Sequence, residues 1–297
     1  MKQMQYRQSF GSKLFDASNY FFMLVLVVIM VYPLLNIIAI SLSHADFIAL
    51  GQVNIFPKGF NVKGYEVIFS KQLVYISYKN TILYAAAGTF LTLFLTSLMA
   101  YPLTIGNFQL KKFITIFLAV TMFFSGGMIP TYLLIKNLGL LNTFWVMVLP
   151  GCISAYNVII FRTFFQNLPN ELRESAYMDG ASDLVVLFKI YLPLSKALLA
   201  TFALFTIVAH WNEWFSALIY LQDESKYPIQ MFLRSIIFTQ QGYGQSQQIS
   251  EMIQNRQINP KNIQMAAIVI TMAPILCIYP FVQKYFVKGV LVGSLKG

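Results

Sequence analysis

The feature that most constrains this chain is a series of six long apolar runs. They cover about residues 20–42, 80–103, 113–135, 143–165, 197–220 and 263–283. Each run has at least the roughly 20 residues that a helix needs to cross a hydrocarbon core about 30 Å thick. Backbone polar groups in lipid must be satisfied within the segment, so such runs form helices. The sequence therefore predicts an all-α integral membrane protein, with six transmembrane helices in a single domain over residues 1–297.

The composition agrees with a membrane protein and argues against several other classes. The chain is 57% hydrophobic and 11% charged, whereas soluble domains carry about 25% charged residues. The net charge of +10 is not gathered in a cluster or stripe, so no nucleic-acid partner is indicated. Two cysteines and two histidines are too few to suggest a disulfide framework or a metal site. The charges instead lie beside apolar runs, where they would meet lipid headgroups.

The distribution of basic residues predicts the topology. A basic leader precedes the first run, which is longer than the core of a signal peptide and is therefore expected to be retained. More than half of the 21 Lys and Arg residues fall on the short segments of one side. By the positive-inside bias, that side is cytoplasmic. We therefore expect both termini inside, long outer loops over 43–79 and 221–262, and an inner loop over 169–193.

The inner loop reads as a helical hairpin. Pro169 suits the first turn of a helix, where its missing N–H costs nothing. Apolar residues then recur at helical spacing until Asp179 and Gly180, and glycine is free to adopt left-handed backbone angles. A second apolar helix follows and is expected to end at Pro193. A soluble hairpin between membrane segments is suited to gripping a partner.

The spacing Glu174-x-Ala176-x3-Gly180-x9-Ile190-x-Leu192-Pro193 resembles the EAA loop of ABC importer permeases. The resemblance implies a cytoplasmic loop that docks into a groove on an ATP-hydrolysing subunit. Ser175 stands where the family usually has Ala, and Ala197 where many relatives have Pro, and neither departure removes the docking role. The alternative is an ordinary interfacial hairpin without a partner. The residues expected to couple to the ATPase are Glu174, Ala176, Asp179, Gly180, Ile190, Leu192 and Pro193.

The fifth run holds the candidate substrate pathway. A charged Glu213 at the bilayer centre would cost ~2.5–3.5 kcal/mol, less near the interface, so it should face a cavity or a partner. Trp211 and Trp214 share a helix face, and an indole suits the C–H face of a sugar ring. The alternative is an aromatic belt with a structural Glu213. The broken segment in the third run should lie at a similar depth in the outer half of the membrane. The candidate pathway residues are Trp211, Asn212, Glu213, Trp214, Gly126 and Gly127.

Further residues narrow the resemblance to the carbohydrate-uptake branch of these permeases. Trp-Asn-Glu follows the EAA loop, and the segments 220–234 and 283–297 are similar to oligosaccharide permeases that depend on a lipoprotein. The resemblance implies a bacterial cytoplasmic membrane and a carbohydrate, specifically oligosaccharide, substrate. The implied partners are a second, different six-span permease, two ATPase subunits and an extracytoplasmic solute-binding protein. In maltose-type relatives the C-terminal tail reaches the ATPases, which here implicates Lys288, Gly289, Gly293 and Ser294.

The chain has no signature of an enzyme. No GxxxxGK[ST] phosphate loop occurs, so ATP and Mg are expected on partner subunits and no cofactor on this chain. No HExxH or GxSxG motif supports a membrane hydrolase. A stand-alone secondary transporter is the main alternative, and it would favour an internal repeat and several intramembrane acids. No repeat is visible, and Glu213 is the only acid well inside a run.

Overall fold

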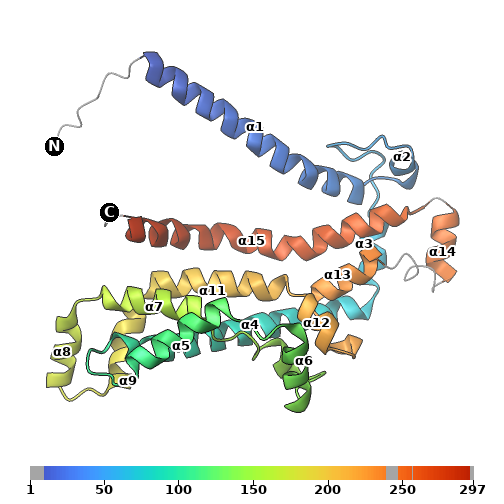
Figure 1. The fold of residues 1–297 in the computed structure, drawn as a ribbon. Coiled ribbons are helices and arrows are strands. Elements are labelled where there is room, and N and C mark those ends of the chain that lie inside the picture. Colours follow the sequence, from blue (N-terminus) through green and yellow to red (C-terminus); the bar gives the residue numbers. More distant parts are fainter. Residues whose placement is uncertain (1–9, 239–246, 256, 295–297) are drawn as a thin grey trace. The chain divides into compact units, whose positions relative to one another are not determined.

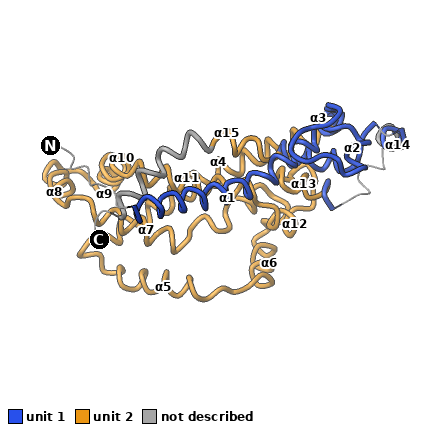
Figure 2. The backbone as a smooth tube through the Cα atoms, turned by 90° about the horizontal axis from the view of Figure 1, so that it is seen from above, with its two compact units in different colours: residues 1–70, 236–270 blue, residues 71–235, 271–297 orange. Residues whose placement is uncertain are grey.

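A computed structural model describes residues 10–238, 247–255 and 257–294, with side chains for 10–238, 251–255 and 257–278. The regular elements in these ranges are all helical (Figure 1), which confirms the predicted all-α class. The chain divides into two compact units. Unit 1 comprises residues 1–70 and 236–270, and unit 2 comprises residues 71–235 and 271–297 (Figure 2).

Unit 1 is built around the C-terminal end of a long apolar helix. Its elements are α1 (Phe10–Ser41), α2 (Ala45–Ala49), α3 (Lys63–Phe69), α14 (Gln247–Gln254) and the first part of α15 (Pro260–Ser294). Apolar side chains are exposed along most of α1, and its buried residues are confined to Ala39, Ile40 and Ser41. A helix with such an apolar exterior is suited to lipid.

The end of α1 is held by one buried amide. Asn262, which is 1% exposed, donates from Nδ2 to the carbonyl oxygens of Ile40 and Ser41, both at 2.9 Å. Gly64 in α3 packs so closely on the Asn262 side chain that a Cβ there would overlap it. The hydroxyls of Ser41 and Tyr65 are also hydrogen-bonded at 2.7 Å. The Asn262 amide thereby satisfies carbonyls that a helix end leaves without intrahelical partners.

Unit 2 contains most of the helices. They are α4 (Gln72–Ala100), η1 (Pro102–Thr104), α5 (Lys111–Phe123), α6 (Met128–Asn137), η2 (Phe144–Met147), α7 (Ala155–Gln166), α8 (Asn170–Met178), α9 (Asp183–Val186), η3 (Leu187–Tyr191), α10 (Leu192–Leu194), α11 (Lys196–Trp211), α12 (Phe215–Tyr220), η4 (Glu224–Lys226) and most of α13 (Ile229–Phe238). In both views, α8 and α9 lie at one end of the unit, and α6 and α12 lie at the other (Figures 1 and 2).

Close packing of α4 against α11 and α7 forms the centre of unit 2. The buried face of α4 carries small residues at helical spacing, so neighbouring backbones can approach closely. Gly88 is the tightest point, because a Cβ there would overlap the imidazole of His210 in α11. The small side chains of this face are Ser77, Thr81, Ala85, Gly88, Thr89, Thr92, Thr96, Ser97 and Ala100.

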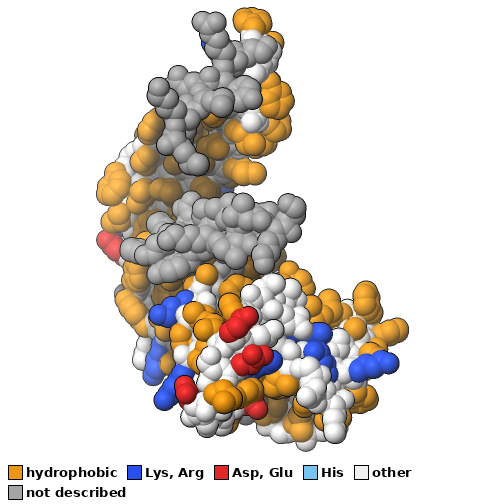
Figure 3. Space-filling model, turned by 90° about the vertical axis from the view of Figure 1, so that its left-hand side faces the viewer, with side chains coloured by type: hydrophobic (Ala, Val, Ile, Leu, Met, Phe, Trp, Pro, Cys, Tyr) orange, Lys and Arg blue, Asp and Glu red, His pale blue; other side chains and the backbone are white. Residues whose placement is uncertain are grey.

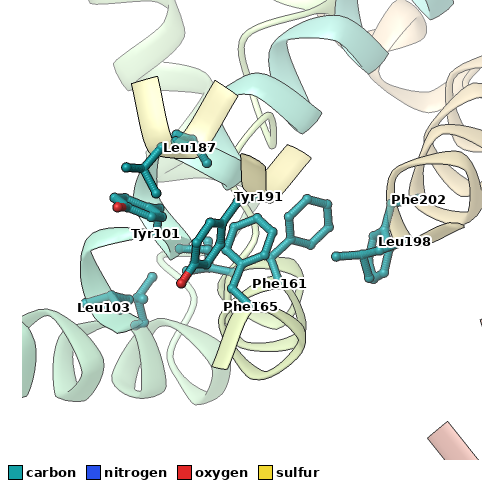
Figure 4. Packing of buried hydrophobic residues seen from close by; sticks show 12 residues of the cluster. Tyr101, Leu103, Phe161, Phe165, Leu187, Tyr191, Leu198 and Phe202 are labelled. Carbon is teal, nitrogen blue, oxygen red and sulfur yellow. The ribbon is translucent and has the colours of Figure 1, made fainter. Parts of the chain in front are cut away.

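A second core region joins α9 and η3 to the bundle at the α8–α9 end (Figure 4). Tyr191 of η3 packs edge-on against Tyr101 and Phe165, with ring centroids 5.1 and 5.5 Å apart. Phe161 of α7 meets Phe202 of α11 at 5.1 Å. Edge-to-face aromatic pairs add to the burial energy of such a cluster. The short elements after residue 180 are therefore anchored in the same core as the long helices.

The helices differ in several places from the expected apolar runs. Three described helices, α1, α4 with η1, and α15 to residue 278, are long and apolar enough to cross a membrane, and five candidates result if two bent pairs each count as one. These pairs are α5–α6, bent by 119°, and α9–α10 with α11, bent by 82°. Helix α4 begins at Gln72, although we expected the span to begin at residue 80. In the fourth run, η2 is followed by irregular backbone, and α7 begins only at Ala155, after Pro150 and Gly151.

The expected outer loop over residues 221–262 also contains helices. Its clearest one is α13, in which Ile229, Phe232 and Ile236 are buried. Their spacing places them on one face of a helix. We had predicted a loop because this region is rich in Gln, Asn and charged residues. Its apolar side chains nevertheless recur at helical spacing, so this part of the expected loop is helical.

Candidate functional site

The hairpin over residues 169–193 turns at Gly180. Gly180 has φ +78°, which is left-handed, and its N–H donates to Tyr177 O at 3.0 Å. The N–H of Ala181 donates to Ala176 O at 2.9 Å. These two bonds form a Schellman motif, which satisfies the last carbonyls of α8 and favours glycine at its left-handed position. We expected Pro169 in the first turn of this helix. It is instead the N-cap, one residue before α8 begins.

Helix α8 has one attached flank and one free flank. Ala176 packs against the core that contains Phe165 and Leu187, whereas Glu174 and Asp179 are exposed. No residue of α8 is buried. The lower part of Figure 3 looks onto this end of unit 2, where acidic side chains lie among basic and hydrophobic ones. The free flank of α8 therefore offers mixed polar and apolar contacts to another surface.

The second half of the hairpin continues into α11. Ile190 and Leu192 are partly buried against the core, and Pro193 is exposed within α10. The helical path passes through the π-helical turn η3 and reaches Leu194, so it does not end at Pro193. A proline near the start of a short helix removes only an N–H that has no intrahelical partner. The chain then bends by 82° into α11 around Ser195.

Asp183 ties the hairpin to the bundle. Its Oδ1 accepts a hydrogen bond from Tyr177 of α8 at 2.6 Å and another from Tyr101, the C-cap of α4, at 3.0 Å. Burial raises the pKa of the Tyr177 hydroxyl, and its hydrogen bond to Asp183 raises that pKa further. Tyr177 therefore stays protonated and donates at physiological pH. One carboxylate thus joins the end of α4 to both helices of the hairpin.

Glu213 lines an open pocket with a volume of about 410 Å³. Helices α4, α7 and α11 form its walls, and it contains hydroxyl, amide, imidazole and carboxylate groups beside two phenylalanines. Pockets of this size with a few polar groups are typical ligand sites. No Lys or Arg is among its lining residues, which are Thr92, Pro150, Gly151, Tyr156, Asn157, Phe202, Phe205, Thr206, Ala209, His210 and Glu213.

The backbone breaks where Glu213 stands. Helix α11 ends at Trp211 and α12 begins at Phe215, whereas we expected one helix over 197–220. Glu213 Oε1 accepts from the N–H of Ser216 at 2.8 Å, so it caps the first turn of α12. Asn212 lies just outside α11, and its Oδ1 accepts from Gln230 Nε2 at 3.3 Å.

The two tryptophans of this segment have different surroundings. Trp211 is 5% exposed, and its Nε1 donates to Thr271 O at 3.0 Å. Its ring lies beside Tyr78, with centroids 6.1 Å apart. Trp214 is partly exposed, and the Arg234 guanidinium lies over its ring at 4.3 Å. Trp211 is therefore a packing residue with its only donor in use, while Trp214 belongs to a cation–π pair.

The remaining candidate residues lie apart from this pocket. Gly126 and Gly127 are exposed in the break between α5 and α6, and neither lines the pocket that contains Glu213. Gly127 has φ +83°, so this sharp turn favours glycine. For the tail, the backbone of α15 is helical to Ser294. The side chains of Lys288 and Ser294 lie outside the described residues, and so do any contacts of that tail.

The chain matches the model of the family "Binding-protein-dependent transport system inner membrane component" over residues 6–292. It belongs to this family. The match covers nearly every described helix, so the chain is a membrane permease subunit as a whole. The family is that of ABC importer permeases, which favours the resemblance given above over a stand-alone secondary transporter.

Individual relatives are similar to this chain over nearly their full length. The permease is 41% identical to the polygalacturonan/rhamnogalacturonan transport system permease protein YtcP of Bacillus subtilis (strain 168), over 96% of this chain and 99% of that protein. It is 42% identical to Protein LplC of the same organism, over 97% and 96% of the two chains. A solved bacterial ABC transporter involved in the import of the acidic polysaccharide alginate contains a similar chain, with a TM-score of 0.89, 29% identity and coverage of 95% and 100%.

The structure adds residues to the permease that the sequence pattern did not select. Tyr101 and Asp183 are 82 residues apart in the chain, and no spacing rule joins them. Thr92, Asn157 and Thr206 line the pocket around Glu213. Their signal in the sequence is weak, since single Thr and Asn residues within apolar runs also occur as ordinary packing residues.

Proposed function

We propose that this permease forms half of the translocation pathway of an ATP-driven importer for an oligosaccharide. A second, different six-span permease forms the other half. Two ATPase subunits bind ATP and Mg, and an extracytoplasmic solute-binding protein delivers the sugar. This chain contributes six spans, with residues 143–165 as the fourth, and both termini are cytoplasmic. It holds no cofactor and catalyses no reaction itself.

Coupling is the central part of the proposal. The observation that carries it is the arrangement of α8, which has an exposed flank with Glu174 and an attached flank with Ala176. We propose that the exposed flank docks on an ATPase subunit. Movement of the ATPase would then be transmitted through the aromatic core to α4 and α11. The tail from residue 287 would contact the ATPases as a second element.

Copurification tests this role. The permease is expressed with its neighbouring permease and an ATPase, and the ATPase is recovered through a tag on this chain. We expect Glu174→Lys to reduce ATPase recovery, because it reverses a charge on the free flank of α8. Glu224→Lys, which changes an exposed acid in η4 of unit 2, should leave recovery unchanged. If the wild-type chain recovers no ATPase, the proposed function is wrong.

We further propose that the pocket around Glu213 is part of the sugar pathway. Its Thr, Tyr and Asn side chains provide donors and acceptors for sugar hydroxyls, and Phe202 and Phe205 provide apolar surface. The absence of Lys and Arg from its lining means that it offers no strong partner for a uronate carboxylate. We therefore expect this subunit to bind hydroxyl groups, whereas any acidic group on the substrate would bind the partner permease.

Glu213→Gln tests the pathway separately from folding. A glutamine retains an acceptor for the Ser216 N–H but loses the negative charge in the pocket. We expect impaired oligosaccharide uptake with normal assembly and near-normal basal ATP hydrolysis. Glu224→Gln makes the same chemical change outside the pocket and should transport normally. Normal uptake by Glu213→Gln would contradict the pathway role, and loss of assembly would show that the carboxylate is structural.

A further inference from the structure

Three basic side chains converge on one pocket at the start of α5. Lys111, Lys112 and Arg162 all line an open pocket with a volume of about 490 Å³. The pocket belongs wholly to unit 2 and is formed by the segment 106–116 together with α7. No acidic residue is among its lining residues. It is separate from the pocket around Glu213, with which it shares no residue.

None of the three cations has a carboxylate partner among the described residues. Lys111 Nζ lies 3.4 Å from a backbone oxygen, that of Ile105. The guanidinium of Arg162 donates from Nη1 to Thr115 Oγ1 at 3.3 Å, and its Nε is buried without a hydrogen-bond partner. Like charges around one pocket repel each other, and a buried donor without a partner is unfavourable. An anion in the pocket would relieve the repulsion between the three cations.

The geometry of the donors suits a phosphate group. A guanidinium presents a planar fork of N–H groups that matches phosphate oxygens, and lysines supply mobile point charges. Thr115 fixes the guanidinium in place, because its hydroxyl also donates to Lys111 O at 2.7 Å. Helix α5 begins at Lys111 with no acidic residue in its first turn. The positive end of its dipole therefore adds to the field of the three side chains.

Apolar surface continues directly from the pocket. Ile116 lines the pocket and is itself exposed, and it lies between exposed Phe113 and Phe117, whose rings stack with centroids 6.4 Å apart. A free inorganic anion would gain nothing from this surface. A phospholipid would place its headgroup phosphate among the cations and its acyl chains along α5. The combination of basic pocket and apolar helix face therefore favours a lipid.

We propose that Lys111, Lys112 and Arg162 form a binding site for the phosphate headgroup of an anionic phospholipid. The cytoplasmic position of this pocket rests on the topology proposed above. The pocket adjoins the core that anchors α9 and η3, since Phe108 lines the pocket and packs against that core. A bound lipid would thus hold the start of α5 beside the coupling hairpin and would stabilise this end of the permease in the membrane.

Native mass spectrometry of the purified importer measures lipid retention. Phosphatidylglycerol or phosphatidylcholine is added to the complex in detergent. The complex is then washed with detergent to remove weakly bound lipid, and the number of lipids retained is counted. We expect preferential retention of phosphatidylglycerol. Loss of each cation should weaken it about fivefold, so Lys111→Gln with Lys112→Gln should weaken it about 25-fold. Lys189→Gln with Lys196→Gln removes the same charge from exposed positions outside the pocket and should retain the lipid.

Other outcomes would overturn the proposal. Equal retention of the two lipids, or an equal loss in the control variant, would show that the pocket has no specific role. Displacement of the lipid by inorganic phosphate at low concentration would assign the pocket to a soluble anion. Loss of the ATPases from the Lys111 and Lys112 variant, with lipid retention unchanged, would assign it to an acidic protein surface. If the wild type recovers no ATPase, the same lipid measurement on the permease chain alone still tests the site.

The Arg162→Lys variant separates loss of lipid binding from loss of folding. It keeps the charge but loses the planar fork, so it should fold and bind phosphatidylglycerol more weakly than the wild type. Lys112→Arg keeps the charge at an exposed position and should bind as the wild type does. Wild-type affinity in the Arg162→Lys variant would contradict a phosphate held by the guanidinium.

Discussion

Replacing Asp183 with alanine should release the coupling hairpin from the bundle. The carboxylate accepts hydrogen bonds from Tyr101 and Tyr177. Tyr177 is 41% exposed, so its hydroxyl can turn to water when the carboxylate is lost. Tyr101 is only 3% exposed, and a buried donor without a partner costs about 1–3 kcal/mol. We therefore expect the population of the opened hairpin to rise by roughly five- to 150-fold.

Hydrogen exchange of the α8 amides measures this opening in the assembled importer. Tyr101→Phe should have a smaller effect than Asp183→Ala, about 0.5–1.5 kcal/mol, because the exposed carboxylate is hydrated when its partner is removed. A variant with both Tyr101→Phe and Asp183→Ala should exchange no faster than Asp183→Ala alone. In that double variant the buried Tyr101 hydroxyl is absent, so no donor is left without a partner. Glu224→Ala removes an exposed acid outside the hairpin and serves as the control.

Two results would refute this reasoning. Unchanged exchange of α8 in Asp183→Ala would mean that the aromatic core alone holds the hairpin. Strictly additive effects of Tyr101→Phe and Asp183→Ala would mean that the two side chains do not interact, because contacting residues show a coupling energy in a double-mutant cycle.

Three further predictions concern glycines and the tail. Gly180→Val places a β-branched residue at φ +78°, which costs ~1–2 kcal/mol, and copurification and uptake assays should show an inserted chain with weakened ATPase association and transport. Gly88→Ala should lower thermal stability by ~1–3 kcal/mol through overlap with the His210 imidazole, and His210→Ala should restore it. Deletion of residues 287–297 should leave insertion intact but alter substrate-stimulated ATP hydrolysis in reconstituted complexes. Normal transport by Gly180→Val would contradict the first prediction, and failure of His210→Ala to restore stability would contradict the second. Unchanged stimulation of ATP hydrolysis after the deletion would contradict the third.

Local rules in the sequence were sufficient to predict the turn at Gly180. A helix that ends in a Schellman motif needs a left-handed residue after its C-cap, and Gly180 follows Asp179 in that position. The all-α class could also be predicted, since long apolar runs in lipid leave few other solutions. Both inferences depend on neighbouring residues or on a whole segment, so no tertiary contact has to be known.

The faces of the helices could not be predicted in the same way. In an apolar run every side is hydrophobic, so periodicity does not reveal which side packs on protein. Trp211 was therefore a candidate for the pathway, although its indole is buried and bonded to Thr271 O. The position of Asp183 against Tyr101 depends on how α4 and α9 meet. The break at residues 212–214 was missed because neither Gly nor Pro marks it in the sequence.

Helix α11 connects the two candidate sites of the permease directly. The coupling hairpin leads into it through the bend at Ser195. Thr206 and His210 near the far end of α11 line the pocket together with Glu213, which follows the helix. His210 lies about 20 Å along the axis from Lys196, at 1.5 Å per residue. A change of about 10° in the bend at Ser195 would therefore move His210 by roughly 3.5 Å, which is more than the length of a hydrogen bond to a sugar hydroxyl. Modest movement of the hairpin is thus sufficient to rearrange the pocket, and no separate relay between the two sites is needed.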